Sequence, residues 1–356
     1  MRRSVGLWIK SHRALLLILL IACALRIGYL LYYHGLSEWN QLTVDNLYHH
    51  NWAISIAHGH IFGGTTYFRA PFYVYCLGLL YAVFGTSLWV GRLFGLAIGV
   101  ASVAMTYFLG KRVFTLRVGL VAALLQAFCP ILIYFESELL LDPLFTLLVQ
   151  ITLYQIITWR ESQRPRELLV AGVLSGLAAI TRPTILVIIP LVIVLVILQS
   201  RVLRYVLRQS ALYICGALII IGPIFIRNLI VAGDPVLIAS QGGINWYIGN
   251  NASADGISAT LPEPLGFNWR IKDITYVAEK ERGRELRPGE VSAFWTAKAD
   301  DWILSHPGDF LSLTFKKLYY ILGPREISNN RDLPSFFARV PLLHYNPLGF
   351  GLILAL

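Results

Sequence analysis

The sequence is poor in charge and in cysteine, and each shortage excludes a class of protein. Asp, Glu, Lys and Arg make up only 14% of the 356 residues, while apolar residues make up 56% and the mean hydropathy is +0.62. Several apolar runs are long enough to cross a bilayer, which excludes a pair of soluble domains. The four cysteines all lie inside apolar runs, which predicts small buried side chains instead of a disulfide framework. The composition predicts a polytopic membrane protein.

Other features are missing as well. Neither GxGxxG nor GxxxxGK[ST] occurs, so no nucleotide-dependent enzyme or ATP pump is indicated. The net charge of +10 would suggest nucleic acid as the partner of a soluble chain. Here most basic residues lie in short loops between apolar runs, so we expect no nucleic acid. The basic N-terminus leads into an apolar run without a small-residue cleavage site, which predicts an uncleaved first helix.

Six apolar segments have the character of full membrane spans. They are residues 14–33, 93–110, 118–135, 143–159, 185–198 and 211–226. Two shorter runs, Phe72–Phe84 and 168–180, have 13 residues each, and runs of this size are as often interfacial as spanning.

The basic loops decide between these alternatives, because short cytoplasmic loops are enriched in Lys and Arg. Three loops carry Lys111, Arg112 and Arg117; Arg160, Arg164 and Arg166; and Arg201, Arg204 and Arg208. All three are cytoplasmic, like the N-terminus, if Phe72–Phe84 lies along the outer surface and residues 168–198 cross twice. We therefore predict seven spans in a membrane module of residues 1–226.

This topology divides the rest of the chain. Residues 34–90 become the first external loop, which we predict to be catalytic. Residues 227–339 are polar and rich in turn signals, which predicts a large external loop with an interfacial helix at about 311–322. Residues 340–356 begin what resembles an eighth span, so we expect the protein to continue beyond them.

Asp45 is the first candidate for chemistry. It lies in the first external loop among aromatic and histidine side chains and opens the helix-like stretch NLYHHNWAISIAH. A carboxylate at a membrane surface can serve as a general base toward a hydroxyl or hold a cation. The alternative is a structural N-cap of that helix. Both interpretations remain open on the residues alone.

Three arginines have different predicted roles. Arg69, between an aromatic pair and Ala-Pro, could bind a phosphate at headgroup depth or contact bulk lipid, and Arg182, in a turn between two short spans, has the same two alternatives. Arg26 lies well inside the first span. A charge buried in the bilayer is costly unless it is paired, so we expect a structural ion pair there.

A second acidic group comprises Glu136, Glu138 and Asp142. Because Glu138 and Asp142 are four residues apart, we expect them on one helical face at the mouth of the bundle. They could position an acceptor or hold a divalent metal, or be ordinary solvated loop residues. The histidines of residues 49–60 lack the ligand spacing of a closed zinc site, so no metal cofactor is predicted.

The ordered set of motifs resembles the GT-C superfamily of membrane glycosyltransferases, in particular bacterial relatives of protein O-mannosyltransferases and lipid A aminoarabinose transferases. The motifs extend over nearly the whole chain. They are the first helix with Asp45-x-x-Tyr48, YFRAPFY with Arg69, GRLFGLAIGVASVAMTYFLGKRVF, PILIYFESELLLDP with Asp142, SGLAAITRPT, GGINWYIGNNASADG and EISNN. Many relatives have two adjacent acids in the first loop, whereas Asp45 is followed here by Asn46.

The resemblance implies a GT-C-like helical bundle and transfer of a hexose or pentose from a polyprenyl-phosphate donor outside the cytoplasm. By position, Asp45 becomes the general base of an inverting transfer to a lipid, glycan or protein. Arg69 and Arg182 become ligands of the donor phosphate. Tyr48, Glu138 and Asp142 become residues of the acceptor side. We expect the enzyme in the inner or plasma membrane, with the active site on the external or periplasmic face.

Two rival functions remain. A polyprenyl-lipid or glycan transporter or flippase predicts inverted repeats and polar residues at the membrane midplane, whereas the polar residues here gather at one face. A polymerase or ligase that uses pyrophosphate-linked lipids would share much of this architecture.

Overall fold

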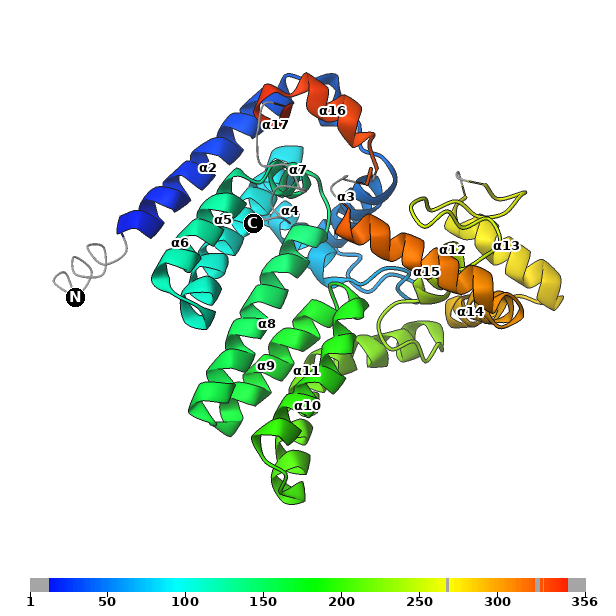
Figure 1. Ribbon diagram of the computed structural model, residues 1–356. Helices are drawn as coiled ribbons and strands as arrows, with labels where there is room; N and C mark the ends of the chain where they lie inside the picture. Colours follow the sequence, from blue (N-terminus) through cyan, green and yellow to red (C-terminus); the bar gives the residue numbers. More distant parts are fainter. Residues whose placement is uncertain (1–12, 267–268, 324–326, 329, 345–356) are drawn as a thin grey trace. The chain divides into compact units, whose positions relative to one another are not determined.

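A computed structural model describes residues 13–266, 269–323, 327–328 and 330–344 (Figure 1). The described residues form helices and turns without a β-strand, which confirms the predicted all-α class. The chain divides into two compact units. Unit 1 comprises Met1–Ile61, Pro71–Ile220 and Ser328–Leu356, and unit 2 comprises Phe62–Ala70 and Ile221–Ile327. The predicted eighth span lies almost entirely outside the described residues.

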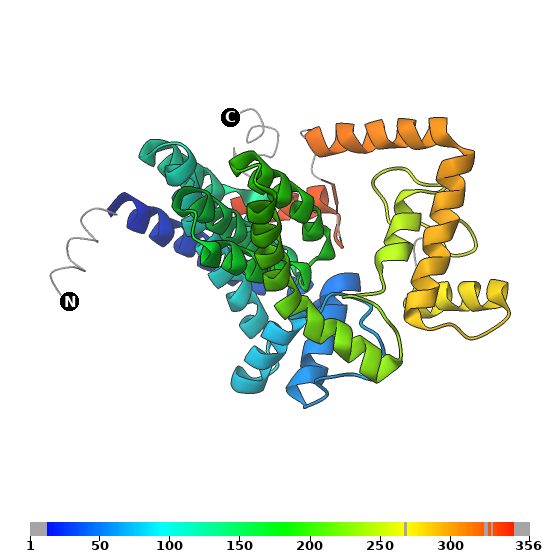
Figure 2. The same cartoon turned by 90° about the horizontal axis from the view of Figure 1, so that it is seen from below.

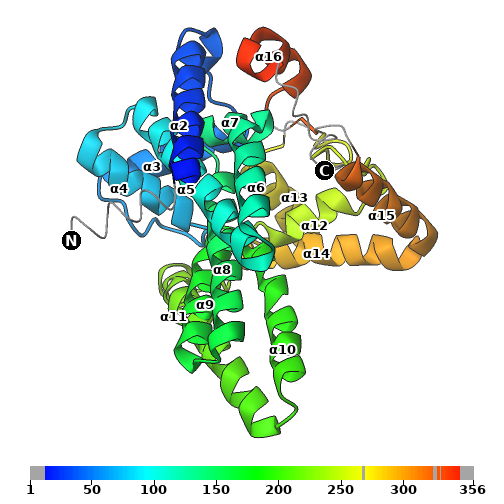
Figure 3. The same cartoon turned by 60° about the vertical axis from the view of Figure 1, so that its left-hand side comes forward.

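Unit 1 holds most of the apolar helices. In chain order they are α2 (Arg13–His34), η1 (Ser37–Asn40), α3 (Val44–Ala57), α4 (Phe72–Phe84), α5 (Leu88–Val113), α6 (Leu116–Phe128), α7 (Pro130–Ser137), α8 (Asp142–Ser162), α9 (Pro165–Ala179), η2 (Pro183–Val187), α10 (Ile188–Gln199), the first part of α11 (Leu203–Ala232), α16 (Leu333–Arg339) and α17 (Pro341–His344). Figure 1 shows α2, α5 and α6 packed side by side, and in Figure 3 α3 lies against α4.

Within the described residues, three helices are long and apolar enough to cross a membrane: α2, α5 and α11. A fourth candidate is the pair α6 and α7, which is bent by 58° at Cys129. Pro130 explains the bend, since proline at the first position of α7 cannot continue the hydrogen bonding of α6. The chain is therefore a membrane protein, and the count of seven spans remains a prediction. The short run Phe72–Phe84 coincides with α4.

Glycines allow α7 to approach α5 closely. Gly91, Gly95 and Gly99 recur every fourth residue of α5, a spacing that leaves one helical face without side chains. A Cβ atom built at Gly95 would overlap the backbone carbonyl of Glu136, and one built at Gly99 would overlap its carboxylate. Because the glycine face accommodates Glu136, that acidic side chain can be held inside the bundle.

Arg26 of α2 is the partner of Glu136, which confirms the expected ion pair. Arg26 Nε lies 2.5 Å from Oε2 of Glu136, and Nη2 donates to Oε1 at 2.9 Å. Nη1 donates to the carbonyls of Ala22 and Ala127 at 3.2 and 3.1 Å. The side chains are 2% and 6% exposed, so each charge is neutralised inside the bundle.

A closed ring of polar side chains joins α5, α6 and α8. Ser102 donates to Gln150 at 2.9 Å, Gln150 to Thr106 at 2.9 Å, Thr106 to Gln126, and Gln126 back to Ser102 at 2.8 Å. Each hydroxyl and each amide donates once and accepts once within the ring. Polar side chains that satisfy each other in this way can join apolar helices without exposing donors to lipid.

Unit 2 contains the rest of α11 and the helices α12 (Gly242–Gly249), α13 (Ile271–Arg282), α14 (Pro288–Ser305) and α15 (Pro307–Leu322). Ile244, Ile274, Phe294 and Trp295 form its buried core. Figure 2 shows α15 leaving α14 at a sharp turn. The helix predicted at 311–322 is therefore confirmed within α15, and its apolar residues Leu311, Phe315, Leu318 and Leu322 are exposed. Its position in the membrane interface remains a prediction.

Candidate active site

Asp45 is the second residue of α3 and is half-buried. Its interpretation as the N-cap is wrong, because the helix begins at Val44 and Thr43 occupies the capping position. The backbone N–H of Thr43 donates to Oδ1 of Asn46 at 2.6 Å, one of the two bonds of a capping box. Asp45 is thus not needed to cap the helix, and its carboxylate lies in the first turn, where the helix dipole favours a negative charge.

Glu138 anchors this end of α3. Its carboxylate is 3% exposed and accepts hydrogen bonds from Nδ2 of Asn46 at 2.7 Å and from the hydroxyl of Tyr33 at 2.8 Å. Asn46 itself is fully buried. The interpretation of Glu138 as an ordinary solvated loop residue is therefore excluded. The residue joins the end of α2 to the start of α3.

Arg331 brings a distant part of the chain to the same carboxylate. Its Nε lies 3.5 Å from Oε1 of Glu138, and its Nη2 donates to the carbonyls of Glu38 at 3.0 Å and Gln41 at 2.5 Å. The side chain is only 9% exposed. Asp332, the next residue, caps α16 by accepting from the N–H of Ser335 at 3.2 Å. The capped start of α16 therefore fixes the position of the Arg331 backbone.

The helix α3 also packs on the linker that follows Glu138. Nδ1 of His49 lies 2.9 Å from the carbonyl oxygen of Leu139. The ring of Tyr48, a predicted acceptor-side residue, contacts the rings of His49 and Trp52, with centroids 6.1 and 5.7 Å apart. The first two turns of α3 are thereby held on residues 138–139, close along the chain to Asp142.

Asp142 and Arg182 form an ion pair. Arg182 Nη1 lies 2.6 Å from Oδ1 of Asp142, and the two side chains are 48% and 39% exposed, the arginine more than the aspartate. The expected common helical face of Glu138 and Asp142 is wrong, because α7 ends at Ser137 and α8 begins at Asp142. The carbonyl of Ile180, beside Arg182, accepts from the N–H of Phe72 at 2.9 Å, so the start of α4 lies on the turn that carries Arg182.

Arg69 belongs to unit 2, in the segment Phe62–Ala70. The carbonyls of Tyr67 and Phe68 accept from the N–H groups of Ser240 and Gln241 at 2.9 and 3.0 Å. Arg227, near the end of α11, donates to the carbonyl of Thr65 at 2.7 Å, and its guanidinium lies 3.9 Å from the ring centroid of Tyr67. These contacts order the short segment that ends in the half-buried Arg69.

A second buried arginine lies beneath the aromatic groups of the first loop. Arg92 of α5 is fully buried, donates to the carbonyls of Ser137 at 3.1 Å and Trp39 at 2.7 Å, and stacks 3.6 Å from the ring centroid of Trp39. Burial, together with the nearby charge of Arg92, lowers the pKa of His50 below 6.5.

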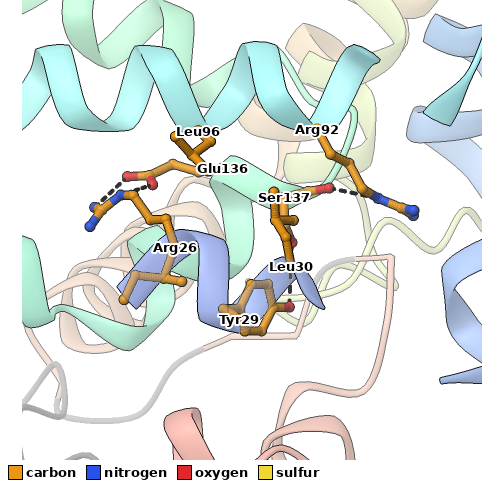
Figure 4. A pocket seen from close by; sticks show the side chains of 8 residues that line it. Arg26, Tyr29, Leu30, Arg92, Leu96, Glu136 and Ser137 are labelled. Atoms are coloured by element: carbon orange, nitrogen blue, oxygen red, sulfur yellow. Dashed lines mark hydrogen bonds and ion pairs between the residues drawn. The ribbon is translucent and has the colours of Figure 1, made fainter. Parts of the chain in front are cut away.

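A small cavity lies under this region, lined by Arg26, Tyr29, Leu30, Arg92, Leu96, Ile133, Glu136 and Ser137 (Figure 4). The figure shows the ion pair of Glu136 with Arg26 and the hydrogen bond from Arg92 to the carbonyl of Ser137. The cavity holds about 10 Å³, room for about one water molecule and too little for a sugar. Among the described residues, no group of three or more His, Cys, Asp or Glu side chains could hold a metal.

Residues 69–229 match the family model of dolichyl-phosphate-mannose-protein mannosyltransferase. These residues are similar to that family. The family match identifies a membrane glycosyltransferase of the GT-C type, as predicted. No curated protein matches the chain.

The family match covers only part of this glycosyltransferase's candidate site. Arg69, Glu138, Asp142 and Arg182 lie inside the matched residues. Asp45 lies outside them, so its role depends on its own environment. Sequence reasoning missed three contributors, Asn46, Arg92 and Arg331. Two of them had a signal in the sequence: Asn46 directly follows Asp45, and Arg331 directly follows the motif EISNN. Nothing in the sequence, however, connects either residue to Glu138.

Proposed function

We propose that the glycosyltransferase moves a hexose or pentose from a polyprenyl-phosphate donor to a lipid, glycan or protein acceptor on the non-cytoplasmic face. The observation that carries this proposal is the carboxylate of Asp45, placed in the first turn of a helix whose start is locked to buried Glu138. A carboxylate so held can accept a proton from a hydroxyl at a fixed position. The family match supports the donor class.

In the proposed reaction Asp45 removes the proton of the acceptor hydroxyl while that oxygen attacks the anomeric carbon of the sugar. The bond between this carbon and the donor's phosphate oxygen breaks, and the lipid phosphate leaves with the electron pair. Attack opposite to the leaving group inverts the anomeric centre. Arg69 binds the phosphate and stabilises its growing charge.

The ion pair of Arg182 with Asp142 modifies the role proposed for Arg182. Its charge is already compensated by a carboxylate, so a phosphate must displace Asp142 to bind there. The pair is exposed enough for such an exchange, because solvent-exposed pairs are worth only about 0–1 kcal/mol. Arg69 remains the main phosphate ligand in this proposal.

The decisive experiment replaces Asp45 with Asn in membranes that carry the full protein. Transfer from a polyprenyl-phosphate sugar should fall by about 10²-fold or more, in line with the loss of a general base. Asp309→Asn, an exposed acid in the first turn of α15, is the matched control and should retain activity. Full transfer by folded Asp45→Asn protein would refute the role of the base.

The donor and topology need separate measurements. A deletion strain should accumulate the lipid-linked sugar or the unmodified acceptor. If the protein were a transporter, its deletion would instead leave the donor on the side of the membrane where it is made. Single cysteines placed in the basic loops, such as at Arg164, should be protected from an impermeant reagent applied outside. Labelling of that loop in intact cells would contradict a cytoplasmic N-terminus and an external active site.

A further inference from the structure

The two oxygens of Glu138 are both occupied within unit 1. Oε1 accepts from Tyr33 and lies within ion-pair distance of Arg331, while Oε2 accepts from Nδ2 of Asn46. A carboxylate that already has these partners and is only 3% exposed is not accessible to an acceptor. Glu138 is therefore better suited to holding other residues than to binding substrate.

The amide of Asn46 has one possible orientation in this arrangement. Its oxygen accepts from the N–H of Thr43, and its nitrogen donates to Glu138. Reversing the amide would place its oxygen against the carboxylate and its NH₂ against an N–H donor, so both bonds would be lost. The start of α3 is thus held by two hydrogen bonds that depend on each other.

We propose that Asn46 and Glu138 are positioning residues that fix Asp45, and that Arg331 completes their network from the far end of the chain. This inference rests on the proposed role of Asp45 as the base. Arg331 neutralises Glu138 and joins it to the carbonyls of Glu38 and Gln41, just before α3. The network thereby determines where the first turn of α3 lies.

The network also explains why asparagine follows Asp45. An aspartate in place of Asn46 could still accept from Thr43, but its second oxygen would face Oε2 of Glu138 without a proton between them. Two buried carboxylates in such contact repel each other strongly. An ionised acid at position 46 is therefore incompatible with Glu138 as the structure places it.

This reasoning predicts a specific rescue. In Glu138→Gln, the new NH₂ group meets either the NH₂ group of Asn46 or the guanidinium of Arg331, and in Asn46→Asp two carboxylates meet. The double variant Asn46→Asp/Glu138→Gln exchanges donor and acceptor, because the introduced glutamine amide donates to the introduced aspartate. That aspartate still accepts from Thr43, and the remaining amide oxygen of the glutamine accepts from Tyr33. The sizes of the side chains and the net charge are unchanged.

The test measures transfer by the full-length protein in membranes. Each single variant should lower kcat about 10- to 100-fold with little change in KM for the donor, since a misplacement of about 1 Å can cost 10² in rate. The double variant should recover kcat to within about threefold of wild type. Arg166→Gln, which alters a 71% exposed arginine in the first turn of α9, is the control and should leave kcat unchanged.

A second readout separates positioning from general stability. Hydrogen exchange of the backbone amides of residues 44–48 should rise in both single variants and return to the wild-type rate in the double variant. Exchange in α8 should stay unchanged. If wild-type protein shows no transfer but this exchange pattern holds, the proposed function fails and the positioning network stands.

Several outcomes would overturn the inference. They are full kcat in either folded single variant, or a double variant no more active than the worse single variant. A loss confined to KM would instead make Glu138 a substrate ligand. If the Glu138 variants do not fold, Tyr33→Phe deletes one donor to the same carboxylate, and unchanged kcat in that variant would equally refute the proposal.

Discussion

Replacing Glu136 with Gln should destabilise the protein strongly without touching the candidate site. The substitution leaves the charge of Arg26 inside the bundle, where its Nε and Nη2 atoms lie 2.5 and 2.9 Å from the two carboxylate oxygens. Removing one partner of a buried ion pair costs about 3–5 kcal/mol, because an uncompensated charge remains. Gln can accept one of the two bonds, and Nη1 keeps its carbonyls of Ala22 and Ala127. We therefore expect a loss near the lower limit, about 3 kcal/mol.

The assay is reversible unfolding of purified protein in mixed micelles, with helix content followed as denaturant increases. The double variant Arg26→Met/Glu136→Leu is the control, because it removes both charges and keeps similar volumes. Replacing a whole buried pair by apolar residues is often neutral or stabilising. A loss below about 1 kcal/mol in Glu136→Gln, or a double variant as unstable as the single, would refute the argument that pairing inside the bundle holds α2 on α7.

Three further predictions concern other contacts. Asp142→Asn should release Arg182 and tighten binding of a polyprenyl phosphate by a few-fold; weaker binding would mean that the aspartate itself contacts the donor. Gln126→Leu breaks the polar ring of α5, α6 and α8 and should cost roughly 0.5–2 kcal/mol of unfolding free energy in micelles, and a stabilised variant would show that the ring is dispensable. Because the pKa of His50 is lowered in the folded state, the unfolded protein binds more protons below pH 6.5. Stability should therefore fall as the pH drops below 6.5, and the fall should be smaller in His50→Gln; equal pH slopes would exclude this histidine as the cause.

The helices and the pairing of Arg26 could be foreseen because they depend on local properties. Hydropathy over a window of residues predicts an apolar helix, and the predicted boundaries of Phe72–Phe84 coincide with α4. An arginine in the middle of an apolar run must find a partner, whatever that partner is. The sequence also identified the motif that carries Arg69 and placed Asp45 at the start of a helix, as an N-cap two residues after the actual one, Thr43.

The partners were decided only by the tertiary structure. Glu138 lies 92 residues from Asn46 and 105 from Tyr33, and no periodic pattern connects residues so far apart. The break between α7 and α8 turned Glu138 away from Asp142 and into the bundle, although their spacing predicted a common face. Charge and hydropathy along the chain determine which residues must be paired or buried. The packing of distant helices determines which residues become their partners. The hydrogen bonds proposed to fix Asp45 form only once α2, α3 and Arg331 are in contact.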